Sequence, residues 1–238
     1  MMSNKGTAVI VGVGPGLGMS MARRFGREGR RVALLSRGES RHAGYRADLA
    51  EHGVEAATYA VDATDRAALR SALAKIEADG DIDLVYYGCG SSRPPTPIAD
   101  VDSATAAAAF SWVWPAIDVV EAVLPGMRAR GRGGLLFAGG LSSVRPMPAL
   151  GELALAAAAL RNYALTLNAA IAQDGLYAGT LTIGGVVERG DIHAMISADT
   201  ARYGSLQGHT LDPDRIADTA WEMYRSRDRA EEIFDVLD

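Results

Sequence analysis

The sequence has little of what stabilises or anchors several classes of protein. Among its 238 residues Cys89 is the only cysteine, which excludes an intrachain disulfide and a cysteine-based metal cluster. We therefore expect no metal site, and a lone thiol suits the reducing cytoplasm. Positive charge is also scarce, because 24 lysines and arginines stand against 29 aspartates and glutamates, for a formal net charge of -5. Such a chain lacks the basic surface that a nucleic-acid partner requires.

Long uninterrupted apolar runs are absent as well. The run Thr7–Val13 is too short and too rich in glycine for a secretion signal, so we interpret it as a buried strand. Residues 153–172 approach the length of a membrane span, but Arg161, Asn162 and Asn168 interrupt them. We expect a helix there that is buried against a neighbouring subunit, and no membrane partner.

What the sequence does contain is a regular alternation of two patterns. Short continuous apolar runs, each typical of a strand buried on both faces, occupy Ala8–Val11, Val32–Leu35, Ala57–Val61, Leu84–Tyr87, Gly134–Phe137 and Gly179–Ile183. Helical patterns lie between them at roughly 17–28, 39–52, 65–78, 102–129 and 150–173. Strand followed by helix, five times over, predicts an α/β fold with a doubly wound parallel sheet of the Rossmann type.

The alternation ends after Ile183. Residues 184–212 are polar with little periodicity, and we interpret them as a mobile substrate loop with short helices. A last helix is predicted to begin at Pro213 with Asp212 as its N-cap, and Ile233–Leu237 fits an edge strand. No linker is visible, so residues 1–238 are predicted to form a single domain.

The first predicted strand leads into a glycine-rich turn, Gly12-Val13-Gly14-Pro15-Gly16-Leu17-Gly18, and then into a helix. Glycine allows a turn with φ > 0 and lets backbone amides approach a pyrophosphate without an intervening Cβ. The start of the helix adds a partial positive charge. A purely structural turn is the alternative, but the strand before it and the helix after it favour nucleotide binding.

The Gly-x-x-x-Gly-x-Gly spacing of Gly12, Gly16 and Gly18 resembles the short-chain dehydrogenase/reductase family, and the order of elements extends this resemblance over nearly the whole chain. The resemblance implies a cofactor site built from Gly12, Gly14, Pro15, Gly16, Leu17, Gly18, Ser36, Arg37, Asp62, Ala63 and Gly90.

Two segments of that implied site bear on which cofactor is bound. NAD-preferring relatives place an acid at the end of the second strand, whereas Ser36 and Arg37 offer a hydroxyl and a bidentate cation, which suit NADP(H). Asp62 matches the family position that meets the adenine amino group. After the fourth strand, residues 87–90 keep only Gly90 of the family's Asn-Asn-Ala-Gly, so that contact departs from the pattern.

The tyrosine and lysine that the family uses for proton transfer are missing. The chain has two lysines, Lys5 and Lys75, and neither lies four residues after a tyrosine. Alignment to the family places Leu153 at the tyrosine, Ala157 at the lysine and Gly140 at the serine. Losing a general acid typically costs about 10²–10⁴-fold in rate. The reaction therefore needs no proton donor there, or another side chain supplies it, or no hydride moves.

Several side chains could replace the missing groups, and each has a plainer explanation. His193 lies in the predicted substrate loop, where an exposed histidine is the alternative, and Tyr203 and His209 share that argument with less weight. Ser142 and Ser143, with Arg145, follow the fifth strand, where turn chemistry is the alternative. Glu152 adjoins Leu153 but points about 100° away on a helix, so it can simply be a helix-start carboxylate. Trp112 and Trp114 either wall an apolar pocket or belong to the core.

Three functions remain open. The first is an atypical NADP(H)-dependent oxidoreductase of a small molecule whose acceptor needs no enzyme-bound acid, such as a conjugated system or a cationic iminium. The second is a non-redox catalyst on the same scaffold, for example a cyclase, isomerase or dehydratase, and the third is a non-catalytic NADP-binding protein. Fold alone does not choose among them. The resemblance also implies a homodimer or homotetramer, formed through the helices at about 102–129 and 150–173.

Overall fold

A parallel sheet of seven strands forms the centre of the computed structural model, which describes residues 6–90, 94–203 and 205–237. The strands stand in the order β3-β2-β1-β4-β5-β6-β9, and every neighbouring pair is parallel. They are β1 (Thr7–Val11), β2 (Arg31–Ser36), β3 (Ala56–Ala60), β4 (Ile82–Tyr87), β5 (Gly134–Gly140), β6 (Tyr177–Gly184) and β9 (Glu231–Asp235). The order reverses between β1 and β4, which confirms the predicted doubly wound fold.

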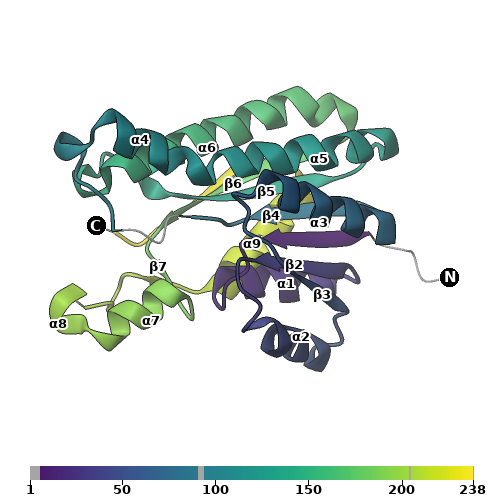
Figure 1. Cartoon of the computed structure of the whole chain (residues 1–238), viewed down its shortest axis with the longest axis horizontal. Coiled ribbons are helices and arrows are strands. Elements are labelled where there is room, and N and C mark those ends of the chain that lie inside the picture. Colours follow the sequence, from purple (N-terminus) through teal and green to yellow (C-terminus); the bar gives the residue numbers. More distant parts are fainter. Residues whose placement is uncertain (1–5, 91–93, 204, 238) are drawn as a thin grey trace.

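Helices cover both faces of this sheet (Figure 1). One face carries α3 (Arg66–Asp79), α5 (Trp114–Arg130) and α6 (Gly151–Ile171), and the other carries α1 (Leu17–Arg27), α2 (His42–Glu51) and α9 (Pro213–Ser226). Each face has its own apolar core, one around Phe137 and Leu160 and the other around Phe25 and Leu34. Strands covered on both faces need apolar residues throughout, which explains why β1 and β4 are buried along their whole length.

The third predicted strand is placed nearly as expected but is not buried on both faces. β3 forms an edge of the sheet and pairs only with β2 among the described residues. Its first four residues are half-buried and Ala60 is exposed. The correction follows from position, because the margin of the sheet receives less cover from the helices than its centre.

The predicted helix at 102–129 is interrupted. α4 (Ser103–Ala109) ends in a 3-10 turn at Phe110–Trp112, and α5 begins at Trp114. Pro115 accounts for the break, because it has no N–H to bond the carbonyl of Ser111. By length and composition alone, Ser103–Arg130 would suffice to cross a membrane, but here α5 packs on α3 and β4.

The segment predicted as a substrate loop contains four short elements. They are β7 (Val186–Val187), α7 (Asp191–Ala198), α8 (Thr200–Tyr203) and β8 (Thr210–Leu211), and β7 pairs with β8. The last helix begins at Pro213 as predicted, and the side chain of its N-cap Asp212 accepts a hydrogen bond from the Asp214 amide. The final strand, β9, runs two residues earlier than predicted and pairs with β6 at the other edge of the sheet.

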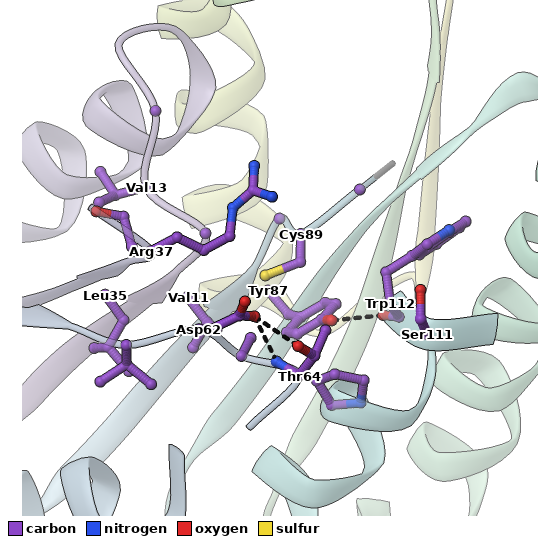
Figure 2. A pocket seen from close by; sticks show the side chains of 18 of the residues that line it. Val11, Val13, Leu35, Arg37, Asp62, Thr64, Tyr87, Cys89, Ser111 and Trp112 are labelled. Carbon is purple, nitrogen blue, oxygen red and sulfur yellow. Dashed lines mark hydrogen bonds between the residues drawn. The ribbon is translucent and has the colours of Figure 1, made fainter. Parts of the chain in front are cut away.

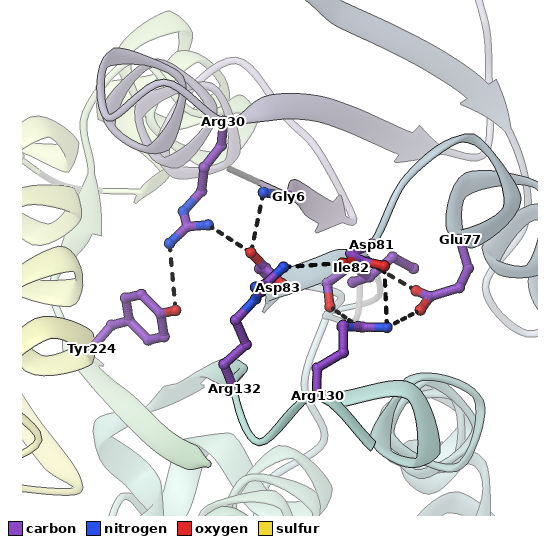
Figure 3. A network of polar contacts seen from close by, with 9 residues as sticks. All are labelled: Gly6, Arg30, Glu77, Asp81, Ile82, Asp83, Arg130, Arg132 and Tyr224. Carbon is purple, nitrogen blue, oxygen red and sulfur yellow. Dashed lines mark hydrogen bonds and ion pairs between the residues drawn. The ribbon is translucent and has the colours of Figure 1, made fainter. Parts of the chain in front are cut away.

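A network of ion pairs holds the amino-terminal edge of the sheet (Figure 3). Asp83 on β4 is 5% exposed and accepts hydrogen bonds from the Gly6 amide at 3.1 Å and from Arg132 Nε at 3.1 Å. Arg30, which is nearly as buried, pairs with the same carboxylate at 3.5 Å. The network therefore joins the start of β1, the loop before β2, β4 and the loop before β5, at the edge opposite to the cleft described next.

Candidate functional site

A cleft of about 890 Å³ opens at the carboxyl edge of the sheet, where β1, β2 and β4 end (Figure 2). Open α/β sheets bind ligands at this edge, beside the point where the strand order reverses. Seven of the predicted cofactor residues line it: Gly12, Gly14, Ser36, Arg37, Asp62, Ala63 and Gly90. The other four, Pro15, Gly16, Leu17 and Gly18, complete the glycine-rich turn and start α1, without lining the cleft.

The glycine-rich turn is packed too tightly for side chains at Gly12 and Gly18. Gly12 has φ +82°, and a Cβ there would lie 2.9 Å from the amide nitrogen of Cys89. A Cβ at Gly18 would lie 2.9 Å from Cα of Val13, which would push the helix away from the turn. Gly14, in contrast, has open space beside it, so its backbone faces the cleft without obstruction. This arrangement is the one that an anionic ligand at the start of α1 needs.

The end of β2 places a free cation at the cleft wall. Arg37 is exposed, and it forms no ion pair within the described part of the chain. Figure 2 shows its side chain extending over the pocket. The Ser36 hydroxyl is engaged locally, at 2.8 Å from Nε2 of the buried His42 and 3.0 Å from the Gly38 carbonyl oxygen. Arg37 is therefore the group available to an anion here.

Asp62, which follows β3, and the end of β4 also line the cleft. Asp62 accepts hydrogen bonds from the Thr64 amide and hydroxyl, and these bonds hold the pKa of its carboxyl below the usual range. Burial raises the pKa of the Cys89 thiol to about 11, so the thiol is neutral at pH 7 and is not a poised nucleophile.

Tyr87 forms part of the floor of the cleft. Burial raises the pKa of its phenol, which stays protonated at neutral pH. The phenol donates its proton to the Trp112 carbonyl oxygen at 2.5 Å, so that proton is not directed at a ligand (Figure 2). The bond also ties the interruption between α4 and α5 to the sheet.

The structure separates the candidate catalytic residues into two groups. Glu152 and Leu153, at the start of α6, line the cleft, and so does Trp112. Gly140, Ser142, Ser143, Ala157 and His193 do not line it. Ser143 Oγ is buried and has no hydrogen-bond partner among the residues that the structure describes, and His193 lies half-buried on α7.

The remaining candidates also lie outside the cleft. His209 bonds the Val236 carbonyl oxygen at 3.2 Å, and Arg145 pairs with Asp235. Trp114 is 57% exposed and belongs neither to the cleft lining nor to the core. The side chain of Tyr203 lies outside the described residues.

The start of α6 is held against the segment that follows β4. A Cβ at Gly151 would overlap the Thr96 carbonyl oxygen and lie 2.8 Å from the Ile98 amide nitrogen, so only glycine permits this contact. Glu152 is 7% exposed, and its Oε2 accepts a hydrogen bond from the Thr96 amide at 2.9 Å. Sequence reasoning placed Glu152 as a helix-start carboxylate but had no signal for its partner, which lies 56 residues away.

An ion pair closes one side of the cleft. Arg41, after β2, pairs through both terminal nitrogens with Asp191 at the start of α7, at 2.9 and 2.8 Å. Both residues line the cleft, and sequence reasoning missed both because no local pattern connects residues 150 positions apart. Close by, a Cβ at Gly16 would lie 2.9 Å from the Gly190 amide nitrogen, so the segment before α7 rests directly on the glycine-rich turn.

Comparison with known proteins agrees with this geometry. The family model described as short chain dehydrogenase matches residues 6–196. The chain therefore belongs to the short-chain dehydrogenase family. A comparison with curated protein sequences finds no match.

Solved structures with the same fold are numerous but distant in sequence. The structure of an Agrobacterium tumefaciens 3-oxoacyl (acyl-carrier-protein) reductase with NADP bound has a TM-score of 0.85 at 21% identity, covering 96% of this chain and 92% of that one. An L-sorbose reductase from Gluconobacter frateurii, complexed with NADPH and L-sorbose, has a TM-score of 0.84 at 20% identity, covering 96% and 94%. A metagenomic short-chain oxidoreductase in complex with NADP has a TM-score of 0.79 at 19% identity, covering 96% of each chain. At these identities the likeness shows the fold.

Proposed function

We propose that this protein is an atypical NADP(H)-dependent oxidoreductase that acts on a small molecule without the family's tyrosine–lysine pair. The observation that carries the proposal is Arg37, which follows β2, forms no ion pair with the other described residues, and stands in the wall of a cleft that begins at the glycine-rich turn. A free arginine there suits a 2′-phosphate, whereas an acid would repel it. The NADP and NADPH complexes among the structural neighbours support the same choice.

The residues of the cleft fit this coenzyme. Gly12 and Gly14, with the start of α1, would hold the pyrophosphate, and Asp62 with Ala63 would meet the adenine. Arg37 would hold the 2′-phosphate, and Ser36 would join it once its hydroxyl leaves the Gly38 carbonyl. NADPH, when bound, supplies a hydride. The chain's own contribution is to bind and orient the coenzyme and to exclude water from the far end of the cleft.

The missing proton donor restricts the substrate. Leu153, which the resemblance aligns with the family's tyrosine, lines the cleft, whereas Ala157, aligned with the lysine, is buried and does not line it. Neither side chain can donate a proton to a substrate, and the phenol of Tyr87 donates its proton to the Trp112 carbonyl oxygen. The acceptor should therefore be one that takes a hydride without simultaneous protonation by the enzyme.

Calorimetric titration with NADPH and NADH tests the coenzyme assignment. We expect micromolar NADPH binding, weaker NADH binding, and a loss of at least tenfold in NADPH affinity for Arg37→Glu, because a charge-assisted bond is replaced by repulsion. The control is Arg215→Glu, which makes the same charge change on the exposed surface of α9, away from the cleft. Equal NADPH binding by wild type and Arg37→Glu would overturn the assignment.

A non-redox catalyst is the second candidate. The apolar Leu153 within a large cleft favours it, because such a wall suits a hydrophobic substrate in a site depleted of water. This candidate predicts turnover that survives exhaustive removal of NADP(H), whereas the oxidoreductase loses all turnover. A protein that binds NADPH but turns over no electrophilic acceptor would instead be a non-catalytic binder.

The proposal also extends to the substrate loop, the oligomeric state and the cellular location of the protein. Residues 184–212 would serve as the substrate loop, since α7 reaches the cleft through Asp191. We infer a homodimer or homotetramer, because α5 and α6 leave large apolar side chains uncovered, with Trp114 57% and Leu155 42% exposed. A cytoplasmic location agrees with a single reduced cysteine and an NADP(H) coenzyme.

A further inference from the structure

Glu152 is a buried carboxylate at the edge of the cleft, and no cationic side chain in the described part of the chain balances it. The residue is 7% exposed and lines the cleft beside Leu153. Its hydrogen-bond partner is the Thr96 amide, and no arginine, lysine or histidine of the described ranges forms an ion pair with it. Buried charges in proteins are normally paired, because removal from water costs more than a single neutral hydrogen bond returns.

The surroundings of Glu152 fix the carboxylate in place. Gly151 allows the segment at Thr96 and Ile98 to pack directly on the start of α6. The Thr96 amide then orients one carboxylate oxygen, and the helix start offers partial compensation for the charge. The part of the Glu152 charge that is not compensated creates a negative electrostatic potential at a fixed point of the cleft. Such a point is a preorganised site for positive charge.

The cleft also contains an aromatic side chain. Trp112 lines it, and the face of an indole attracts cations. The phenol of Tyr87, which bonds the Trp112 carbonyl, holds this part of the wall to the sheet. Leu153 adds an apolar surface and no competing donor. An anionic or acidic substrate would be repelled by this carboxylate, whereas a cationic carbon–nitrogen group would be attracted to it.

We propose that Glu152 recognises a positively charged substrate, so that the oxidoreductase reduces a cationic iminium to an amine. The inference rests on the proposed function and deepens it by naming the substrate class. The reduction adds one hydride to the iminium carbon, the C=N π pair becomes the lone pair of nitrogen, and NADPH is oxidised to NADP⁺. The product is a neutral amine that takes its proton from water. The absence of the family's catalytic tyrosine–lysine pair is therefore consistent with this substrate, because the step requires no acid.

A structural role for Glu152 makes a different prediction, and Glu152→Gln separates the two. Glutamine keeps an oxygen that accepts the Thr96 amide, so the loop contact survives while the charge is lost. Glu152→Asp is the matched variant that keeps the charge on a shorter side chain. Melting curves of both variants establish that each is folded before ligands are compared.

The experiment measures binding of two probes by calorimetry. The first is N-methyl dihydroisoquinolinium, a permanently cationic iminium, and the second is tetralone, a neutral ketone of similar shape. Wild type should bind the cation at least tenfold more tightly than the ketone. Glu152→Gln should lose this preference and leave tetralone binding unchanged, and Glu152→Asp should retain a preference for the cation. If wild type shows no preference, or if Glu152→Gln keeps it, the inference is wrong.

Titration with NADPH in the same samples separates this inference from the proposed function. Wild type with bound NADPH should consume it on addition of the iminium, and Glu152→Gln should do so at least tenfold more slowly at low substrate. Failure to bind NADPH, with the cation preference intact, would refute the oxidoreductase and leave the cation site standing. NADPH binding without any cation preference would refute the cation site and leave the coenzyme assignment standing.

Discussion

Replacing Asp83 by alanine should destabilise the protein far more than replacing Asp81, a more exposed aspartate of the same network. The carboxylate is 5% exposed and bonds the Gly6 amide, Arg132 and Arg30 (Figure 3). Its removal leaves the Arg30 guanidinium, whose side chain is 9% exposed, without its carboxylate. Breaking a buried ion pair in this way costs about 3–5 kcal/mol.

Two features of the network lower that estimate. Arg30 keeps contacts with the rings of Trp221 and Tyr224, each at 5.5 Å from its guanidinium carbon, and Arg132 is half exposed and can be hydrated instead. We therefore expect Asp83→Ala to lower the free energy of unfolding by about 2–4 kcal/mol. For a chain of this length each kcal/mol corresponds to about 2–4 °C in Tm.

The assay is urea unfolding followed by circular dichroism, with Asp81→Ala as the control. Asp81 belongs to the same network, but its side chain is 47% exposed, so its pairs with Arg130 and Arg132 should be worth less than about 1 kcal/mol. Asp83→Asn should fall between the two, because it keeps the Gly6 bond and loses the charge. Equal destabilisation by Asp83→Ala and Asp81→Ala would refute the reasoning that burial decides the cost.

Three further predictions concern other parts of the molecule. Arg41→Ala should change the free energy of unfolding by less than about 1 kcal/mol, because the pair with Asp191 is exposed. It should nevertheless speed limited proteolysis within residues 184–212. Unchanged cleavage would contradict the idea that this pair holds α7 against the cleft. Glu231, bonded by both Arg161 and Thr182, has a pKa below the usual range, so its stabilisation is full above the ordinary value and is lost as pH falls through the lowered one. Glu231→Gln should therefore cost about 1–2 kcal/mol at pH 7 and progressively less in acid, and a cost independent of pH would count against this. Light scattering should give a dimer or tetramer, and a monomer at every concentration would contradict the proposed use of α5 and α6.

The parts of the fold that could be predicted are those governed by neighbouring residues in the chain. The glycine-rich turn is an example, because the conformation of Gly12 and the close packing at Gly18 are local requirements that the sequence must satisfy. The start of α9 is another, since Asp212 and Pro213 determine it within two residues. Such signals sufficed for the order of strands and helices and for the seven predicted cofactor residues that line the cleft.

The parts that could not be predicted depend on residues distant in sequence. The partial exposure of β3 follows from its place at the sheet edge, which its apolar run does not reveal. The partners of Glu152 and Arg41 come from segments that only the folded chain brings near. The interruption before α5 is a different case. Pro115 indicates a break at that point, but the apolar periodicity of the run favoured one continuous helix.

The order of strands in the sheet has a consequence for how the chain can be synthesised. Each strand that leaves the ribosome joins a free edge: β2 beside β1, β3 beside β2, then β4, β5, β6 and β9 successively on the other side. No strand has to be inserted between two that are already paired. The helices do not all follow this order. The apolar face of α1 is covered by α9, where Trp221 of α9 contacts Phe25 of α1. The nascent chain therefore keeps that face of α1 uncovered until α9 has emerged, and apolar surface exposed in this way is prone to aggregation during synthesis.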